Sequence, residues 1–207
     1  MTASEATPIP FGIKLQQLAE SDPDGVGAVI VSLDGTDTSL TWSQLERGAN
    51  QWGRVLQAHG AGIGDRVAIA IQNSVDLTCG LLGCWKAGAI PIPVRWDLPD
   101  WERDRVLAVI EATVEVSSKN IEALRKEAAA ADDGPMPAVV APQINGICSS
   151  GATGTPKVIM STRPAEWLPN LSDPFISNWQ GCTRPQVILV MAPMYHTNGF
   201  ATLHFLL

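Results

Sequence analysis

The sequence predicts an α/β fold in which mostly parallel sheets are flanked by helices. Short apolar runs alternate with helical patterns along residues 13–131, and this alternation is typical of βα units. The chain of 207 residues is 45% hydrophobic and 17% charged, which is enough apolar content for a buried core. Its 18 Gly and 15 Pro slightly exceed the usual share and indicate many turns.

The first elements are a short helix and a strand. Residues 13–21 predict a helix that stops near Pro23, and residues 29–31 predict a strand. Asp34 and Gly35 form a turn dipeptide that closes this strand.

The clearest helix covers residues 42–59. Its apolar residues recur at steps of three and four, which places them in one stripe on one face. These residues are Trp42, Leu45, Ala49, Trp52 and Leu56. Thr41 and Gln44 fit a capping box at the start of the helix, and Gly60 fits its C-terminal end.

The next unit pairs a buried strand with a helix. Residues 66–71 are almost wholly apolar and predict the strand. Asn73 or Ser74 can cap a helix over residues 74–87, which ends at Gly88.

Residues 90–94 are extended but contain two prolines. Because Pro has no backbone N–H, we expect an edge strand or a strand that is unpaired on that side. A helix over residues 98–112, a short strand over 113–116 and a helix over 121–131 that Asn120 caps complete this array.

A stretch of Asp, Gly and Pro at residues 132–137 has the composition of a linker. We therefore predict an N-terminal βα subdomain over residues 1–134 and the start of a second α/β subdomain, itself incomplete, over residues 138–207. Three strands are expected in the second part, at residues 144–148, 158–160 and 187–191.

Composition excludes several classes of protein. The net charge of −7 disfavours nucleic-acid binding, because phosphate neutralisation requires Lys and Arg. The sequence contains no signal-peptide pattern and no run of about 18 apolar residues that could span a membrane. The four cysteines lack metal-ligand spacing with one another and with the three histidines. We expect buried, reduced thiols, no metal site and a cytoplasmic protein.

Residues 149–157 join two predicted strands and read Ser-Ser-Gly-Ala-Thr-Gly-Thr-Pro-Lys. The two glycines let the backbone approach a ligand closely, and successive N–H groups in such a loop can bind an anion. Four hydroxyl groups and Lys157 add donors and a positive charge. The loop thus suits a polyphosphate, although it matches neither a Walker A loop nor a dinucleotide fingerprint. An ordinary polar loop is the alternative.

Four further segments accompany the loop at 149–157. They are residues 40–45 (Leu-Thr-Trp-Ser-Gln-Leu), 64–69 (Gly-Asp-Arg-Val-Ala-Ile), 86–93 (Lys-Ala-Gly-Ala-Ile-Pro-Ile-Pro) and 193–199 (Pro-Met-Tyr-His-Thr-Asn-Gly). In their order along the chain, these five segments resemble motifs of the adenylate-forming enzymes, which include acyl-CoA synthetases, luciferase and the adenylation domains of peptide synthetases. In the loop, Ala152 stands where that family usually has a hydroxyl residue, and Val158 stands where it usually has Gly.

The resemblance implies a Rossmann-like large domain and a two-step reaction. A carboxylate would attack the α-phosphate of ATP, with Mg²⁺ bound, and coenzyme A would then displace AMP. The residues expected to bind phosphate are Ser149, Ser150, Gly151, Ala152, Thr153, Gly154, Thr155 and Lys157. Lys157 and His196 are the expected catalytic residues, and His196 would line the site of the acid.

The resemblance covers the N-terminal part of such an enzyme. Three features that this family places further along the chain have no counterpart in this sequence: a Tyr-Gly-x-Thr-Glu segment, a ribose-binding Asp and a C-terminal Lys. We therefore interpret the chain as an N-terminal fragment that is inactive alone, derived from a ligase for a fatty or other hydrophobic acid. The alternatives are an acyl-AMP ligase that serves a carrier protein, a non-catalytic interaction module and a nucleotide-binding dehydrogenase. The missing dinucleotide fingerprint argues against the dehydrogenase.

One geometric expectation follows from strand order. If residues 144–148 and 187–191 are strands of one sheet, the motifs after them emerge at the same sheet edge, where open α/β sheets bind ligands. We therefore expect His196 to lie within one ligand's length of the loop at 149–157.

We expect four tryptophans to pack against the protein, namely Trp96, Trp101, Trp167 and Trp179.

Overall fold

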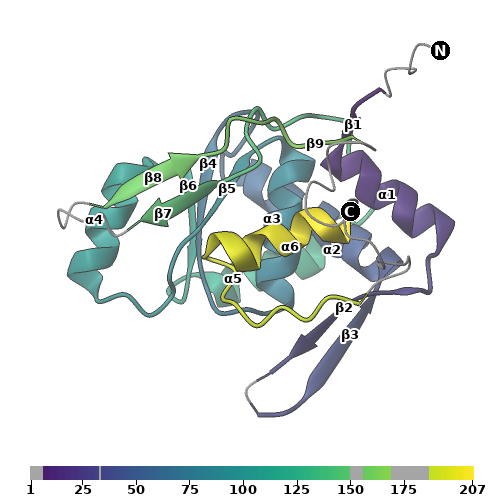
Figure 1. Ribbon diagram of the computed structural model, residues 1–207, viewed down its shortest axis with the longest axis horizontal. Helices are drawn as coiled ribbons and strands as arrows, with labels where there is room; N and C mark the ends of the chain where they lie inside the picture. Colours follow the sequence, from purple (N-terminus) through teal and green to yellow (C-terminus); the bar gives the residue numbers. More distant parts are fainter. Residues whose placement is uncertain (1–6, 33, 150–155, 169–186) are drawn as a thin grey trace, which may run out of the picture.

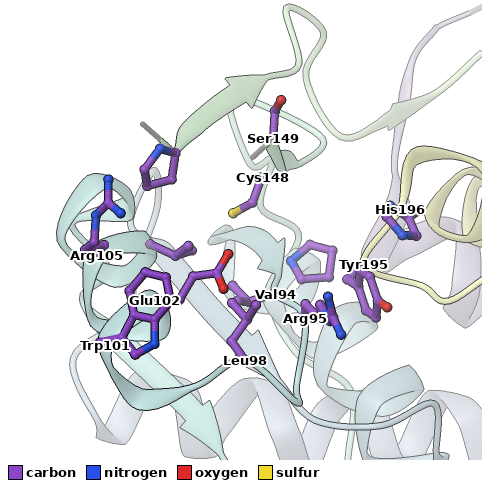
Figure 2. A pocket seen from close by; sticks show the side chains of 13 residues that line it. Val94, Arg95, Leu98, Trp101, Glu102, Arg105, Cys148, Ser149, Tyr195 and His196 are labelled. Carbon is purple, nitrogen blue, oxygen red and sulfur yellow. The ribbon is translucent and has the colours of Figure 1, made fainter. Parts of the chain in front are cut away.

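Figure 1 shows the computed structural model, which describes residues 7–32, 34–149, 156–168 and 187–207. In chain order its elements are β1 (Ile9–Pro10), α1 (Phe11–Ser21), β2 (Val26–Val31), β3 (Asp37–Thr41), α2 (Trp42–Ala58), β4 (Arg66–Ala70), α3 (Val75–Ala87), β5 (Ile90–Pro93), α4 (Asp100–Ile110), β6 (Val114–Ser117), α5 (Ile121–Ala130), β7 (Gly146–Ser149), β8 (Lys157–Met160), β9 (Glu166–Trp167) and α6 (Thr197–Leu206). The predicted α/β class is confirmed.

A parallel sheet with strand order β5-β4-β6 forms the centre. β4 lies in the middle, and its apolar residues 67–70 are almost completely buried. Arg66 is opposite Ile90 of β5, and Val67 is opposite Val114 of β6. The proline-containing strand β5 occupies an edge of this sheet, as its sequence predicts.

The two faces of the sheet carry different layers because side chains alternate along a strand. Val67 and Ile69 belong to the larger apolar core, which α1, α2, α3, α5 and α6 complete. Ala68 and Ala70 point to the opposite face, where they pack with Val106 of α4 in a second cluster. The small alanine side chains let α4 pack close to the sheet.

An antiparallel hairpin of β7 and β8 covers the same face as α4. Ile147 pairs with Ile159 and Cys148 pairs with Val158. Cys148 and Val158 pack toward the cluster under α4, and Figure 1 shows the hairpin beside α4, at the end of the molecule away from α1. The two predicted strands are therefore confirmed, and they pair directly with each other.

Local hydrogen bonds fix the starts of α2 and α3. The Thr41 hydroxyl accepts from the Gln44 N–H at 3.2 Å, and the Gln44 side chain accepts from the Thr41 N–H at 2.8 Å, which confirms the capping box. Ser74 caps α3 by accepting from the Leu77 N–H at 3.1 Å. Gly88 ends α3 with a φ of 77°, a left-handed conformation that suits glycine.

Two expectations about local structure are wrong. Asn120 precedes α5, but its side chain does not cap the helix. The side chain accepts from the Ser117 N–H at 2.8 Å and donates to the Glu115 carbonyl at 2.7 Å, so it closes the turn after β6 instead.

Residues 187–191 do not form a strand. In the described part of the chain no strand pairs with them, and a strand without a partner leaves its backbone groups unsatisfied.

The segment at 132–137 is held against α2. Asn50 donates to the Asp133 carbonyl at 3.0 Å, and Arg54 donates to the Gly134 carbonyl at 2.8 Å. Met136 is buried. The segment therefore belongs to the surface of the helical layer, and the subdomain boundary that we placed there remains a prediction.

Candidate functional site

A cavity of about 740 Å³ opens where four segments meet. They are the residues after β5, the first half of α4, the ends of the β7–β8 hairpin and the turn before α6. Val94, Leu98 and Val106 supply an apolar part of the wall, and Ser149, Tyr195 and His196 supply polar groups. The cavity thus combines an apolar surface with a few polar side chains, as ligand sites do.

His196 reaches the cavity from the N-cap position of α6, directly before Thr197. Its N–H donates to the Pro193 carbonyl at 3.0 Å, and its carbonyl accepts from the Phe200 N–H at 2.9 Å. Because the His196 side chain forms no capping hydrogen bond, its ring is available to the cavity. The Tyr195 ring lies beside it, with ring centroids 4.5 Å apart.

A hydrogen bond across the molecule positions this turn. The Asn73 side chain, in the connection between β4 and α3, accepts from the Met194 N–H at 3.2 Å. Met194 is buried. The turn that presents Tyr195 and His196 is therefore anchored to the connection that follows the central strand.

Both ends of the predicted phosphate loop lie at this cavity. Ser149 and Pro156 line it, and Ser149 pairs with Lys157 across the hairpin. Residues 149–157 therefore connect two paired strands, as predicted. The loop residues between these ends, namely Ser150, Gly151, Ala152, Thr153, Gly154 and Thr155, lie outside the described residues.

Lys157 has a different position from the other predicted residues. It is exposed and is not among the residues that line the cavity. Its neighbour Val158 packs toward the cluster under α4, and successive side chains of a strand point to opposite faces. The Lys157 side chain therefore leaves the hairpin on the face away from α4.

The structure thus brings Ser149 and His196 to one cavity, but by another route than expected. A turn and the start of α6 position His196, since residues 187–191 are not a strand.

Several cavity residues had no predicted role. Arg95 follows β5 and donates to Asp97 through Nε at 2.5 Å and through Nη2 at 3.0 Å. This hydrogen bonding raises the pKa of Arg95 and lowers that of Asp97, so both groups stay charged. Glu102 and Arg105 of α4 face the same cavity. Nothing in a single sequence places these side chains beside a hairpin about 50 residues away.

Two side chains change the expected character of the cavity. Trp101 is 63% exposed and lines it; Trp96 is also exposed, so the expectation that these two tryptophans pack is wrong.

Burial raises the pKa of the Cys148 thiol to about 11, so this cavity thiol is protonated and is a poor nucleophile. Cys79 and Cys84 are buried as predicted.

Within the described residues no group of His, Cys, Asp and Glu could hold a metal ion. The described helices include none with the length and hydropathy to cross a membrane.

The chain belongs to the AMP-binding enzyme family, whose model matches residues 15–146. It is 27% identical over 195 residues to the long-chain-fatty-acid–CoA ligase FadD13 of Mycobacterium tuberculosis, in a match that covers 82% of this chain and 38% of that protein. It is 35% identical over 98 residues to surfactin synthase subunit 3 of Bacillus subtilis, which covers 47% of this chain and 7% of that protein.

Solved structures show the same fold. The inhibitor-bound N-terminal domain of FACL13 from M. tuberculosis matches with a TM-score of 0.75 and 24% identity, over 95% of this chain and 54% of that one. ATP-bound MatB from Rhodopseudomonas palustris matches with a TM-score of 0.72 and 21% identity, over 97% of this chain and 43% of that one. The chain therefore spans about half or less of these relatives.

Proposed function

We propose that this chain is the N-terminal part of an enzyme that activates a carboxylic acid with ATP and transfers the acyl group to coenzyme A. Family membership supports the class of reaction, and the relative named as a long-chain-fatty-acid–CoA ligase supports a fatty or other hydrophobic acid. The observation that carries the proposal is the cavity that both ends of the loop share with His196.

In this proposal the loop at 149–157 holds the β- and γ-phosphates of ATP through its backbone N–H groups and hydroxyls. A carboxylate oxygen attacks the α-phosphorus, the bond to the bridging oxygen breaks, and pyrophosphate leaves. The thiol of coenzyme A then attacks the acyl carbon, and AMP leaves as the new thioester forms. Mg²⁺ is expected to enter with the phosphates of ATP, and no step is assigned to a protein-bound metal.

His196 and Tyr195 orient the acid. An imidazole or phenol N–H or O–H can donate to a carboxylate oxygen and hold it in line with the phosphorus. Lys157 approaches the phosphates from the other face of the hairpin. We also propose that the enzyme works in the cytoplasm and that this chain alone forms no acyl-CoA, since positioning of the α-phosphate carries much of such catalysis.

The test is ATP–pyrophosphate exchange by the longer protein of which we propose this chain is a part, with a panel of carboxylic acids. We expect acid-dependent exchange that His196→Ala impairs through the KM for the acid more than through the KM for ATP. Loss of one well-placed donor costs about 10²–10³ in rate, and Lys157→Ala is expected to fall in that range. Exchange that is absent with every acid, or unchanged in both variants, would refute these roles.

The similarity to surfactin synthase subunit 3 favours a second candidate, an acyl-AMP ligase that passes its product to a carrier protein. The two candidates differ in the second step. Acid-dependent pyrophosphate release without any thioester on added coenzyme A would select the carrier-protein route.

A further inference from the structure

The turn before α6, residues 192–196, presents Tyr195 and His196 to the cavity. Upstream of it, residues 187–191 form no strand, and all five side chains are exposed. This stretch therefore gives the turn little support from the N-terminal side. The position of the two rings depends instead on contacts of the turn itself and of α6.

Contacts with the helical layer fix the downstream side of the turn. Phe200 of α6 is 1% exposed, and its ring meets the Trp85 ring of α3 edge to face, with centroids 6.0 Å apart. A Cβ atom at Gly199 would lie 2.7 Å from the Ala192 carbonyl oxygen and closer still to that of Pro193. The first turn of α6 is therefore folded tightly against the residues before it, a contact that requires glycine.

Asn73 holds the turn from the connection between β4 and α3. Its Oδ1 accepts from the Met194 N–H at 3.2 Å. The residues around Asn73 are fixed, because Ile71 packs against the larger core and Ser74 is the N-cap of α3. Ser74 takes the capping role that either residue could fill, so the Asn73 side chain serves the turn instead. The bond to Met194 is made only two residues before His196.

We propose that Asn73 is a positioning residue for the carboxylic acid, which acts through its bond to the turn that carries Tyr195 and His196. The inference rests on the proposed function, in which these two side chains orient the acid. Asn73 lies outside the five segments that resemble family motifs. Because in-line attack tolerates little displacement of the nucleophile, a shift of this turn lowers the fraction of bound acid that is aligned.

The first experiment tests the anchor in the 207-residue chain. Tyr195 is the one tyrosine of the sequence, so incorporation of fluorotyrosine gives a single fluorine NMR resonance that reports on the turn. Asn73→Leu removes the acceptor at nearly constant size, and Asn73→Asp keeps an oxygen acceptor. Gln72→Leu is the matched control, because Gln72 is an exposed amide in the same connection.

We expect Asn73→Leu to shift the Tyr195 resonance toward its position in the urea-unfolded chain, whereas Asn73→Asp and Gln72→Leu should match the parent. Asn73 is exposed, so these variants should keep the fold, which circular dichroism checks. A Tyr195 resonance that is unchanged in Asn73→Leu, or equally shifted in Gln72→Leu, would overturn the inference.

The second experiment tests the role in the longer protein by acid-dependent ATP–pyrophosphate exchange. We expect Asn73→Leu to raise the KM for the acid by about 3- to 10-fold, the contribution of one neutral hydrogen bond, and to leave the KM for ATP unchanged. In a His196→Ala background the same substitution should have a smaller effect, because Asn73 acts through the turn. An unchanged KM for the acid, or a rise of the same size in the His196→Ala background, would overturn the inference and leave the proposed function in place.

The two experiments separate the inference from the proposed function. A shifted Tyr195 resonance together with exchange that is absent for every acid would refute the proposed function, and the role of Asn73 in acid positioning with it. A shifted resonance with normal exchange kinetics would show that Asn73 supports the turn without positioning the acid, which also overturns the inference.

Discussion

Lys86 and Glu46 form an ion pair inside the helical layer. The Lys86 Nζ lies 2.6 Å from a Glu46 carboxylate oxygen, and the two side chains are 2% and 9% exposed. Asn50 donates to the same carboxylate oxygen at 3.0 Å. Burial lowers the pKa of Lys86, and the hydrogen bond to Glu46 opposes this shift. The pair joins α2 to α3 at the cost of desolvating both charges.

Removal of one partner is expected to destabilise the protein more than removal of both. Lys86→Met leaves the Glu46 carboxylate buried and uncompensated, and such losses cost about 3–5 kcal/mol of unfolding free energy. The double variant Glu46→Met/Lys86→Met leaves no buried charge, so it should lose much less than the sum of the single variants. Urea denaturation of the four proteins measures this coupling, and strictly additive effects would contradict it.

The raised pKa of the Cys148 thiol should make both its labelling rate and the free energy of unfolding depend on pH. Burial raises its pKa from 9.0 to about 11, so its thiolate fraction at pH 8 is about 100-fold lower than that of an unfolded thiol. Labelling of native Cys148 by N-ethylmaleimide should therefore be about 100-fold slower at pH 8 than labelling after denaturation, as measured by peptide mass spectrometry. Native labelling as fast as denatured labelling would contradict the raised pKa.

The same raised pKa affects stability. Between pH 9 and 11 the unfolded chain loses the proton of the Cys148 thiol while the folded chain keeps it, so the free energy of unfolding should fall as the pH rises.

At the scale of elements, Gly83 lets α2 and α3 come into close contact. A Cβ atom at Gly83 would lie 2.8 Å from the Gly53 backbone nitrogen and 2.8 Å from the Trp52 Cβ. Gly80 lies one turn earlier on α3, but the nearest atom to a Cβ there, in Ile69, is 3.6 Å away. Gly83 is therefore required for the helix contact, whereas Gly80 has room for a methyl group.

Alanine at these two glycines is expected to have opposite effects. Gly83→Ala should lower the unfolding free energy by about 1–3 kcal/mol because the helices must separate. Gly80→Ala should be neutral or stabilising by up to about 1 kcal/mol, because Ala has the higher helix propensity. Chemical denaturation of both variants provides the comparison. Equal effects would show that helix propensity, and not the close contact, governs this interface.

Elements with local signals could be predicted from sequence, and elements that depend on distant partners could not. The capping box at Thr41 and the glycine end at Gly88 involve residues within one helical turn, so their patterns were sufficient. The Asn120 side chain could bond to the backbone at the start of α5 or to the backbone of the turn after β6, and the sequence does not show which of the two it prefers. The apolar run at 187–191 matches a strand in composition, but a strand requires a neighbour that the local pattern does not specify.

At the scale of the whole molecule, the sequence motifs predicted candidate residues, and some of these lie at the cavity, but the motifs did not predict the other residues that line it. Residues 149–157 and His196 were candidates from their residue types, and the structure places Ser149 and His196 at one cavity. Arg95, Glu102 and Arg105 reach that cavity only because α4 and the hairpin pack on the same face of the sheet. This packing depends on small side chains at Ala68 and Ala70 combined with the order of the strands, which is a tertiary property.

At the scale of the whole molecule, residues 187–191 form an exposed apolar strip on the surface. Residues 187–191 are all apolar, and Leu189 and Met191 are 79% and 87% exposed. Contiguous exposed apolar surface favours association in water, so this chain should self-associate as its concentration rises. Val187→Ser/Leu189→Ser should reduce that association and leave the fold unchanged, since these side chains are exposed. Sedimentation velocity across a concentration series measures the monomer fraction. Val29→Ser/Val31→Ser, on the exposed face of the β2–β3 hairpin, is the matched control; association that responds to this control and not to the 187–189 variant would place the contact on the hairpin instead.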